Sequence, residues 1–494
     1  MIDPEKSIPE QGISHEALLE QMKALRAQDI NWRENKAFSL VFHQGDEHTE
    51  FLKQAYTLFF EENGLNPMAF RSLRTFEHEV VRMTANLHHG DKNVVGTMTT
   101  GGTESIMLAI RTYRDRARKK QPHIRRPEII VPESAHVAFH KAGKYFDVAM
   151  VVAPLADDFR VDMRAVEKRI NKNTIALVGS APNYPNGQID NIGALGTLAQ
   201  KHGIGLHVDA CIGGFFLPWA ERLGHPIPPW DYRVPGVTSI SADLHKYGYA
   251  AKGASTITYR SMDYLRHQFF VYVDWSGGVF ASPSLPGTRP GGGIAAAWAA
   301  LHAMGADGYS ENARTVMDTA KRFREGIAAI PELAILGDPP VGIMAYRAVD
   351  KKVNIYAVAD QLDKKGWHID RQQKPASLHF MINPGHAQIV DTYLADLREA
   401  VDYVKQHPEA SAAGSAPTYG LIAKAPIRGL VTKNVLAMME EMYGPEGKAP
   451  DLGAPQELEG AEDADDAPPP ANAVPAPLLW FLRAKAALSR IVGR

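Results

Sequence analysis

Two lysines stand six residues apart in the stretch SADLHKYGYAAKG, residues 241–253, and the first of them, Lys246, directly follows His245. An apolar run, residues 237–240, leads into this stretch. Lysine is rarely buried without a specific reason, so an apolar approach to Lys246 has two interpretations. Either a strand simply ends there and meets water, or the strand delivers an amine that reacts with a carbonyl group.

A glycine-rich turn, TTGGTES at residues 99–105, precedes a segment whose apolar residues recur at helical spacing. Backbone N–H groups at the start of a helix attract anions, so Gly102 and Thr103 are candidates for binding a phosphate. A tight packing turn, with Glu104 and the threonines as simple caps, explains the same residues. The spacing matches neither a Walker loop nor a full dinucleotide fingerprint.

Two further polar residues follow apolar, strand-like runs. Asp209 ends such a run in HVDACIGGF (207–215), and His136 follows another in SAHVAFHKA (134–142). The carboxyl ends of parallel strands are where open α/β sheets bind ligands, although each residue could also merely cap a turn. No cluster has zinc-binding spacing and Cys211 is the one cysteine, so we expect no catalytic metal.

Together these features form the set that pyridoxal 5′-phosphate requires. Its phosphate suits a helix N-terminus, and its pyridine nitrogen stays protonated only beside an anion, so a carboxylate keeps the ring an electron acceptor. Its aldehyde needs a lysine that can be neutral, and a flat ring can stack on the pyridine. The sequence therefore favours pyridoxal 5′-phosphate as the cofactor.

Strand-like and helix-like segments alternate through the middle of the chain. Strands are predicted at residues 128–132, 149–152, 174–178 and 205–208, with a helix at 192–202 between the last two. This alternation predicts an α/β fold built on a mostly parallel sheet. The chain of 494 residues is 45% hydrophobic and 22% charged, which is an ordinary globular composition.

Changes in composition divide the chain into five segments. We expect an N-terminal arm (1–70), a large cofactor-binding domain (71–330) and a smaller C-terminal α+β domain (331–443). Residues 444–477 are acidic and rich in Pro and Ala, which predicts a disordered linker. Residues 478–494 place arginines on one helical face and apolar residues on the other, which predicts a short basic amphipathic helix.

The net charge of −2 favours no nucleic acid as a partner. The N-terminus lacks the apolar stretch of a signal peptide and no run reaches membrane-spanning length, so we expect a cytoplasmic protein. Its C-terminal helix either lies weakly and peripherally in a membrane interface or docks on the protein's own surface or on a partner subunit. Both interpretations stay open.

From about residue 66 to residue 443 the chain resembles the sphingosine-1-phosphate lyase family of fold-type I pyridoxal-phosphate enzymes, within the group II decarboxylase superfamily. The resemblance rests on the motifs EVVRMTANL (79–87), TTGGTESIMLAIRTYRD (99–115), ESAHVAFHKAGKYF (133–146), LHVDACIGGF (206–215), TSISADLHKYGYAAKGA (238–254), HQFFVYVDWSGGVFASPSLPGTRPGG (267–292) and GWHID (366–370). It implies a homodimer with shared active sites and a small amine as the substrate.

The resemblance also implies roles for individual residues. The residues that it assigns to the cofactor are Lys246 (Schiff base), Asp209 (pyridine nitrogen), His136 (ring stacking), Gly102, Thr103 and His245 (phosphate), and Gly287 and Thr288 (the cofactor of the neighbouring subunit). Lys246, His136 and Lys252 are the implied catalytic residues, and Lys252 faces the substrate phosphate. Asn66 also binds substrate.

One family segment, Asn-Pro-Leu-His-x-Asp-x-Phe, departs here to LNPMAFRSLRTFE (65–77), which keeps Asn66 but lacks the histidine. His43, Arg71 or Arg74 are candidates to compensate, and we take His43 as a substrate-binding residue.

Three functions remain open on this scaffold. A lyase would cleave the Cα–Cβ bond of a phosphorylated long-chain 2-amino-3-hydroxy substrate by a retro-aldol reaction, releasing an aldehyde and an amine. An amino-acid decarboxylase would use the same electron acceptor but lose carbon dioxide. A non-catalytic scaffold would have no reason to keep the lysine, aspartate and histidine together. We expect the lyase.

Overall fold

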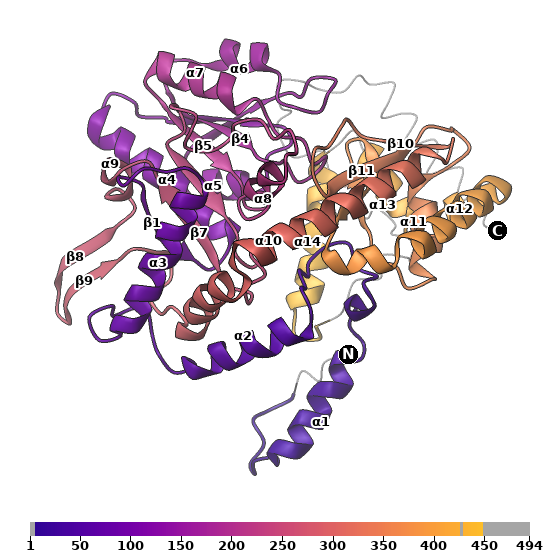
Figure 1. The fold of residues 1–494 in the computed structure, drawn as a ribbon, viewed down its shortest axis with the longest axis horizontal. Helices are drawn as coiled ribbons and strands as arrows, with labels where there is room; N and C mark the ends of the chain where they lie inside the picture. The colour runs from indigo at the N-terminus through magenta and orange to yellow at the C-terminus, as the bar shows by residue number, and fades with distance from the viewer. Residues whose placement is uncertain (1–4, 425–427, 448–494) are drawn as a thin grey trace, which may run out of the picture. The chain divides into compact units, whose positions relative to one another are not determined.

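The computed structural model describes residues 5–424 and 428–447 of the chain (Figure 1). These residues fall into two compact units: Gln11–Ala423 forms one, and the described residues before 11 and after 423 belong to the other. Within the second unit, helix α14 spans Arg428–Tyr443. The predicted linker from residue 448 onward and the predicted helix 478–494 lie outside the described residues. All residues proposed for chemistry belong to the first unit.

A seven-stranded sheet forms the centre of this unit, in the strand order β1-β7-β6-β5-β4-β2-β3. Only β7 runs antiparallel to the others. The strands are β1 (Val95–Thr99), β2 (Glu128–Pro132), β3 (Ala149–Ala153), β4 (Thr174–Ser180), β5 (Gly205–Asp209), β6 (Ser239–Ala242) and β7 (Ser255–Tyr259). The predicted α/β class and all four predicted strands are confirmed.

The central strands of the sheet are buried on both faces, which explains why β2 and β4 are largely apolar runs. Every residue of β4 and β5 is buried. Successive side chains point to opposite faces. Ile129 and Val131 therefore join the core around helix α4 (Gly102–Lys120) and α5 (Ala138–Phe146), whereas Ile130 joins the larger core on the other face.

The remaining helices of the large domain connect or flank these strands. They are α3 (Arg71–Leu87), α6 (Met163–Arg169), α7 (Ile192–His202), α8 (Leu217–Arg222), α9 (Met262–Leu265) and α10 (Gly291–Ala328). Helix α7 has the predicted bounds. It begins after Asn191, whose side chain accepts a hydrogen bond from Ala194 N, and ends at Gly203, whose φ of 63° suits glycine. Helix α10 is interrupted at Gly305, where φ is 55°.

A smaller antiparallel sheet of four strands, in the order β10-β11-β13-β12, follows α10. Its strands are β10 (Leu333–Ile335), β11 (Ile343–Ala348), β12 (Asp370–Gln373) and β13 (Ala376–Met381), and its helices are α11 (Ile355–Asp363), α12 (Val390–Gln406) and α13 (Ala416–Lys424), with short 3₁₀ turns at Pro384–Gln388 and Pro408–Ala412.

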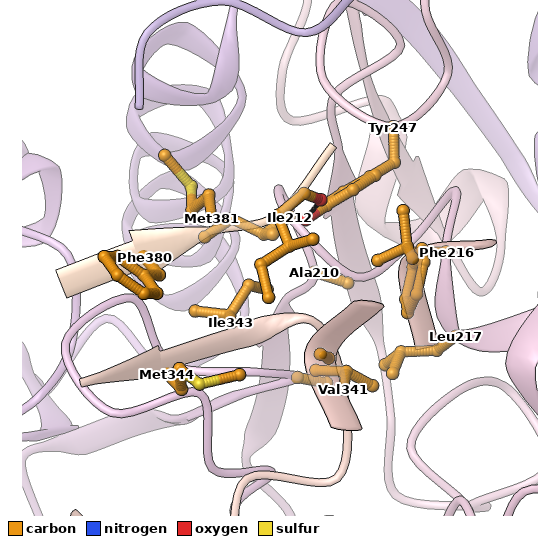
Figure 2. Close-up of a cluster of buried hydrophobic side chains, with 14 of the residues drawn as sticks. Ala210, Ile212, Phe216, Leu217, Tyr247, Val341, Ile343, Met344, Phe380 and Met381 are labelled. Carbon is orange, nitrogen blue, oxygen red and sulfur yellow. Dashed lines mark hydrogen bonds between the residues drawn. The ribbon is translucent and has the colours of Figure 1, made fainter. Parts of the chain in front are cut away.

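The two sheets share one hydrophobic core. Figure 2 shows Ala210 and Ile212, which follow β5, beside Ile343 of β11 and Met381 of β13. Tyr247, next in sequence to Lys246, joins the same cluster, and its hydroxyl donates to the carbonyl of Ile382 at 2.9 Å. The small domain therefore packs against the segments that directly follow Asp209 and Lys246.

The N-terminal arm contains α1 (His15–Arg26), a 3₁₀ turn (Trp32–Glu34) and α2 (Asp46–Leu58). Phe38, fully buried, anchors the arm, since its ring stacks on Phe380 of β13 with centroids 4.0 Å apart. A separate hairpin, β8 (Phe270–Trp275) and β9 (Gly278–Ser282), extends beside the large domain (Figure 1). Within the described residues, no helix is both long and apolar enough to cross a membrane. The domain boundaries stay predictions.

Candidate active site

The carboxyl ends of the parallel strands meet at one edge of the large sheet. Asp209 is the last residue of β5, and the segments that follow β1, β2 and β6 carry Gly102, His136 and Lys246 respectively. Parallel strands all end on the same side, so residues far apart in sequence gather there. This edge is the candidate active site.

An ion pair with Asp243 holds the lysine. Lys246 Nζ lies 2.9 Å from Asp243 Oδ2, and the side chain of Asp243 is only 1% exposed. Burial by itself lowers the pKa of Lys246, but Asp243 and, more weakly, Asp209 outweigh burial and raise that pKa above its usual value. Lys246 in turn lowers the pKa of Asp243 against the effect of burial. The amine is thus held as an ammonium in this arrangement.

The start of α4 forms a cradle against the turn that carries Lys246. A Cβ at Gly102 would lie 2.7 Å from Cys211 Sγ and 2.9 Å from Asp243 Oδ2, and one at Gly101 would lie 3.4 Å from the His245 ring. Glycine is therefore required at Gly102, because any side chain would collide with its neighbours. Burial lowers the pKa of His245, although Asp243 opposes this.

The cradle fits the phosphate of pyridoxal 5′-phosphate. No side chain caps the N-terminus of α4, and Thr103 is exposed there. Free N–H groups at a helix start, with the imidazole of His245 beside them, form a donor set for a dianion. The residues present thus fit the cofactor.

Asp209 is nearly buried, with 8% of its surface exposed. Its Oδ1 accepts from Cys211 N at 3.1 Å and from Ser241 Oγ at 3.5 Å. Among the described residues, neither of these hydrogen bonds uses Oδ2. Oδ2 is therefore available to a ligand.

Lys252 lies at the junction of this site with the arm. Its Nζ donates to the carbonyls of Leu40 at 2.8 Å and His245 at 3.3 Å, and it lies 5.4 Å from the centre of the Phe42 ring. The residue as a whole is exposed, but its ammonium end is enclosed by these groups. Burial of that end and the charge of Lys246 lower the pKa of Lys252 to about 8.

The other proposed substrate residues lie in the arm and the segment after it. His43 Nε2 is 3.4 Å from Asp46 Oδ1, and the ring packs edge-on against Trp32. Asn66 is exposed, and its Oδ1 accepts from Met68 N at 3.0 Å, so it stabilises a turn. No contact places either of these two residues against Lys246 among the residues described, and their substrate roles stay predictions.

Three further residues predicted to contact the cofactor are exposed in the single chain. His136 follows β2, and its Nδ1 accepts from Ala138 N at 3.2 Å. A Cβ at Gly287 would meet no atom within 4 Å, and the hydroxyl of Thr288 accepts from Asn63 Nδ2 at 3.3 Å. Both loop residues are therefore accessible to a second subunit.

Sequence reasoning missed Asp243 and Tyr184. Asp243 precedes Lys246 by three residues, and the acid–base spacing in DLHK was the available signal. Tyr184 follows β4 at the same sheet edge, where its hydroxyl donates to Asp370 Oδ2 at 2.6 Å and its ring packs against His379. Tyr184 had no sequence signal beyond its place after a predicted strand.

Comparison with known proteins agrees with this geometry. Residues 3–349 match the family described as the pyridoxal-dependent decarboxylase conserved domain. The chain is 43% identical to a sphingosine-1-phosphate lyase of Arabidopsis thaliana, over 88% of this chain and 81% of that protein. It is 42% identical to sphingosine-1-phosphate lyase 1 of Rattus norvegicus, over 89% of this chain and 77% of that protein.

Solved structures show the same relationship. The Burkholderia pseudomallei sphingosine-1-phosphate lyase superposes with a TM-score of 0.79 at 38% identity, covering 88% of this chain and 97% of that one. A glutamate decarboxylase of Lactobacillus brevis gives a TM-score of 0.73 at 21% identity, covering 82% of this chain and 96% of that one, which shows the fold alone.

The fold and site define a pyridoxal-phosphate-dependent lyase of fold type I. Pyridoxal 5′-phosphate is its cofactor, as the sequence predicted. The chain belongs to the pyridoxal-dependent decarboxylase family and, within it, to the sphingosine-1-phosphate lyases. The predicted enzyme class is thereby confirmed.

Proposed function

We propose that this enzyme cleaves the bond between C2 and C3 of a phosphorylated long-chain 2-amino-3-hydroxy compound. A base takes the proton of the 3-hydroxyl group, whose carbon becomes an aldehyde as the bond breaks. A proton then returns to C2 and completes the second product, a phosphorylated amine. Bound pyridoxal phosphate supplies an acceptor for the electron pair that the breaking bond releases.

The residues of the sheet edge support this proposal through complementary roles. With pyridoxal phosphate bound, Lys246 would hold the cofactor covalently and Asp209 would pair with its ring nitrogen. His136 would pack on the ring face, while the N–H groups at Gly102 and Thr103 would bind the cofactor phosphate. These tasks leave the substrate phosphate to a separate cation.

The observation that carries the proposal is the position of Lys252. Its Nζ is 3.3 Å from the carbonyl of His245, the residue before Lys246, so a second cation stands beside the reactive lysine. A charge-assisted hydrogen bond from Lys252 to a phosphate would orient the substrate with its amine toward Lys246. A decarboxylase acting on an unphosphorylated amino acid would have no such use for this cation.

The test is a product analysis with purified enzyme loaded with pyridoxal phosphate. A phosphorylated sphingoid base should yield a long-chain aldehyde and a phosphorylated amine in equal amounts, with no carbon dioxide from a panel of amino acids. The same base without its phosphate should react far more slowly. Carbon dioxide release without aldehyde would show that the scaffold serves decarboxylation instead.

We also propose that the enzyme is a homodimer in which Gly287 and Thr288 reach the cofactor of the partner subunit. Their exposure in the single chain supports this arrangement.

We further propose that the protein is cytoplasmic and that residues 478–494 make weak, peripheral contact with a membrane. Flotation on anionic vesicles should then be lost in a chain truncated after Tyr443 and weakened by salt; equal behaviour of both chains would exclude this contact.

A further inference from the structure

A line of buried polar side chains from α4, β5 and β6 leads to Asp209. Tyr113 of α4, Ser239 and Ser241 of β6, and His207 of β5 are all buried, with exposures of 3% or less. The register of the two strands pairs His207 with Ser239 and Asp209 with Ser241. Side chains of paired residues share a sheet face, so His207, Asp209, Ser239 and Ser241 lie on one face of the sheet. Tyr113 of α4 meets that face at Ser239.

Each member of the line contacts the next. Tyr113 Oη is 2.6 Å from Ser239 Oγ, which is 2.8 Å from His207 Nδ1. His207 Nε2 is 3.2 Å from Ser241 Oγ, and Ser241 Oγ donates to Asp209 Oδ1 at 3.5 Å. Both ring nitrogens of His207 therefore have a hydroxyl partner.

The chemistry of the groups gives a direction to the hydrogen bonds nearest Asp209. An ionised carboxylate only accepts, so Ser241 donates to Asp209 and its oxygen is free to accept the Nε2 proton of His207. A neutral imidazole then accepts at Nδ1 from Ser239. Tyr113 has one hydroxyl proton and lies within hydrogen-bond distance of both Ser239 Oγ and Thr238 Oγ1. From Ser239 onward the protons of this arrangement point toward Asp209.

His207 is held neutral in this line. Burial lowers the pKa of His207 to about 4, although Asp209 opposes the change. The ring of Phe139 packs edge-on against the imidazole with centroids 5.8 Å apart. The carboxylate of Asp209 therefore lies at the end of a line of hydrogen-bonded groups, and a fixed donor of this kind holds the oxygen that accepts from it in place.

At the end of the line furthest from Asp209, a glycine leaves room for the ring of Tyr113. A Cβ on Gly205, the first residue of β5, would overlap the ring of Tyr113. Glycine there lets the Tyr113 hydroxyl reach the strand edge, where it also lies 2.7 Å from Thr238 Oγ1. The absence of a side chain at Gly205 thus permits the contact between Tyr113 and Ser239.

We propose that Tyr113, Ser239, His207 and Ser241 form a hydrogen-bonded relay that holds Oδ1 of Asp209 and thereby aims Oδ2 at the cofactor's ring nitrogen. His207 and Ser241 are positioning residues, because they act through Asp209. This inference rests on the proposed pairing of Asp209 with the ring nitrogen. It adds the physical means by which this nearly buried carboxylate is held in position.

The test compares the affinity of the apoenzyme for pyridoxal phosphate and for its analogue in which carbon replaces the ring nitrogen. The wild type should bind pyridoxal phosphate more tightly, and Asp209→Ala should abolish the preference. Ser241→Ala removes the donor that meets the carboxylate and should reduce the preference roughly tenfold, the usual effect of a hydrogen bond to a charged group. Ser241→Thr keeps the hydroxyl and should restore it.

Two more variants separate the relay from a general loss of packing. Ser239→Ala, one link further away, should reduce the preference less than Ser241→Ala does. Thr112→Val is the matched control, because Thr112 is also a buried hydroxyl residue of α4, 3.0 Å from the Tyr259 hydroxyl and outside the relay. It should leave the preference unchanged.

The outcomes are distinct. A wild type that binds both compounds equally would refute the proposed role of Asp209, and the relay with it. A wild-type preference that survives in both serine-to-alanine variants would refute the relay alone. An equal loss in Thr112→Val would also refute the relay, because the effect would then come from packing.

Discussion

Lys246 forms an ion pair with the buried carboxylate of Asp243, with Nζ 2.9 Å from Oδ2, at the carboxyl edge of the large sheet. The carboxylate of Asp243 raises the pKa of Lys246 against the opposing effect of burial. A lysine must lose a proton before it attacks a carbonyl group, so this pair controls when Lys246 is reactive.

Replacing Asp243 by asparagine should lower the pKa of Lys246 in the apoenzyme. Without the carboxylate, burial and the charge of Lys252 would both favour the neutral amine. Lys246 should then be labelled by an amine-selective reagent at lower pH than in the wild type, as followed by peptide mass spectrometry. Asp263→Asn, which removes a surface partner of Lys120, should not shift the labelling profile. An unchanged profile in Asp243→Asn would contradict the role of the ion pair.

Lys246→Ala should abolish covalent attachment of pyridoxal phosphate and reduce turnover to background. No neighbouring amine is held in the same position, since Lys252 Nζ is bound to the carbonyl of Leu40. The measurement is the intact mass after borohydride reduction, with Lys252→Ala as the control that retains the adduct. An adduct on another residue at wild-type stoichiometry would overturn the assignment of Lys246.

The use of phosphorylated substrate should decline as the pH rises through about 8, which is the pKa to which burial and Lys246 lower Lys252. Lys252 is charged below this pH and binds the phosphate, and it loses its proton and that contact above it. The profile of kcat/KM reports the free enzyme and should show this step. Lys252→Ala should raise KM for the phosphorylated substrate by about tenfold or more and remove the step. A step that persists in Lys252→Ala would assign it to another group.

Phe38→Ala should destabilise the protein by about 3–5 kcal/mol, the usual cost of removing a buried aromatic side chain. Phe38 is fully buried and contacts Phe380, Phe323 and Tyr393, so its loss leaves a cavity between the arm and the small domain. Urea unfolding followed by circular dichroism would measure the change. Tyr145→Ala, at a residue 62% exposed, should change stability by less than about 0.5 kcal/mol. Equal stability of the two variants would show that Phe38 does not anchor the arm.

Two inactive variants should restore activity when they share a dimer. Gly287→Glu meets no atom of its own chain, so it should fold normally and yet block the partner's cofactor site. In a mixed dimer with Lys246→Ala, one site combines an intact lysine with an intact loop. Co-expression with two affinity tags would isolate the mixed dimers, and up to half of wild-type activity is expected on the proposed dimer geometry. Full activity of Gly287→Glu alone would exclude a shared site.

The sequence by itself determined the sheet and the kind of chemistry at its edge. Runs such as residues 128–132 and 174–178 are continuous and apolar because both faces of a parallel strand are buried. Parallel strands end on one side, so Asp209 and Lys246 could be placed together before any contact was known. The glycine-rich start of α4 was also local, because it depends on helix geometry alone.

Tertiary structure alone decided which groups act on these residues. The register between β5 and β6 sets His207 against Ser239 and Asp209 against Ser241, and no pattern within either strand specifies that register. Leu40 meets Lys252 across 212 positions of chain because Phe38 is packed against the small domain. Such contacts arise from packing between distant segments, whereas the sequence pattern records only the burial and the backbone preference of each segment.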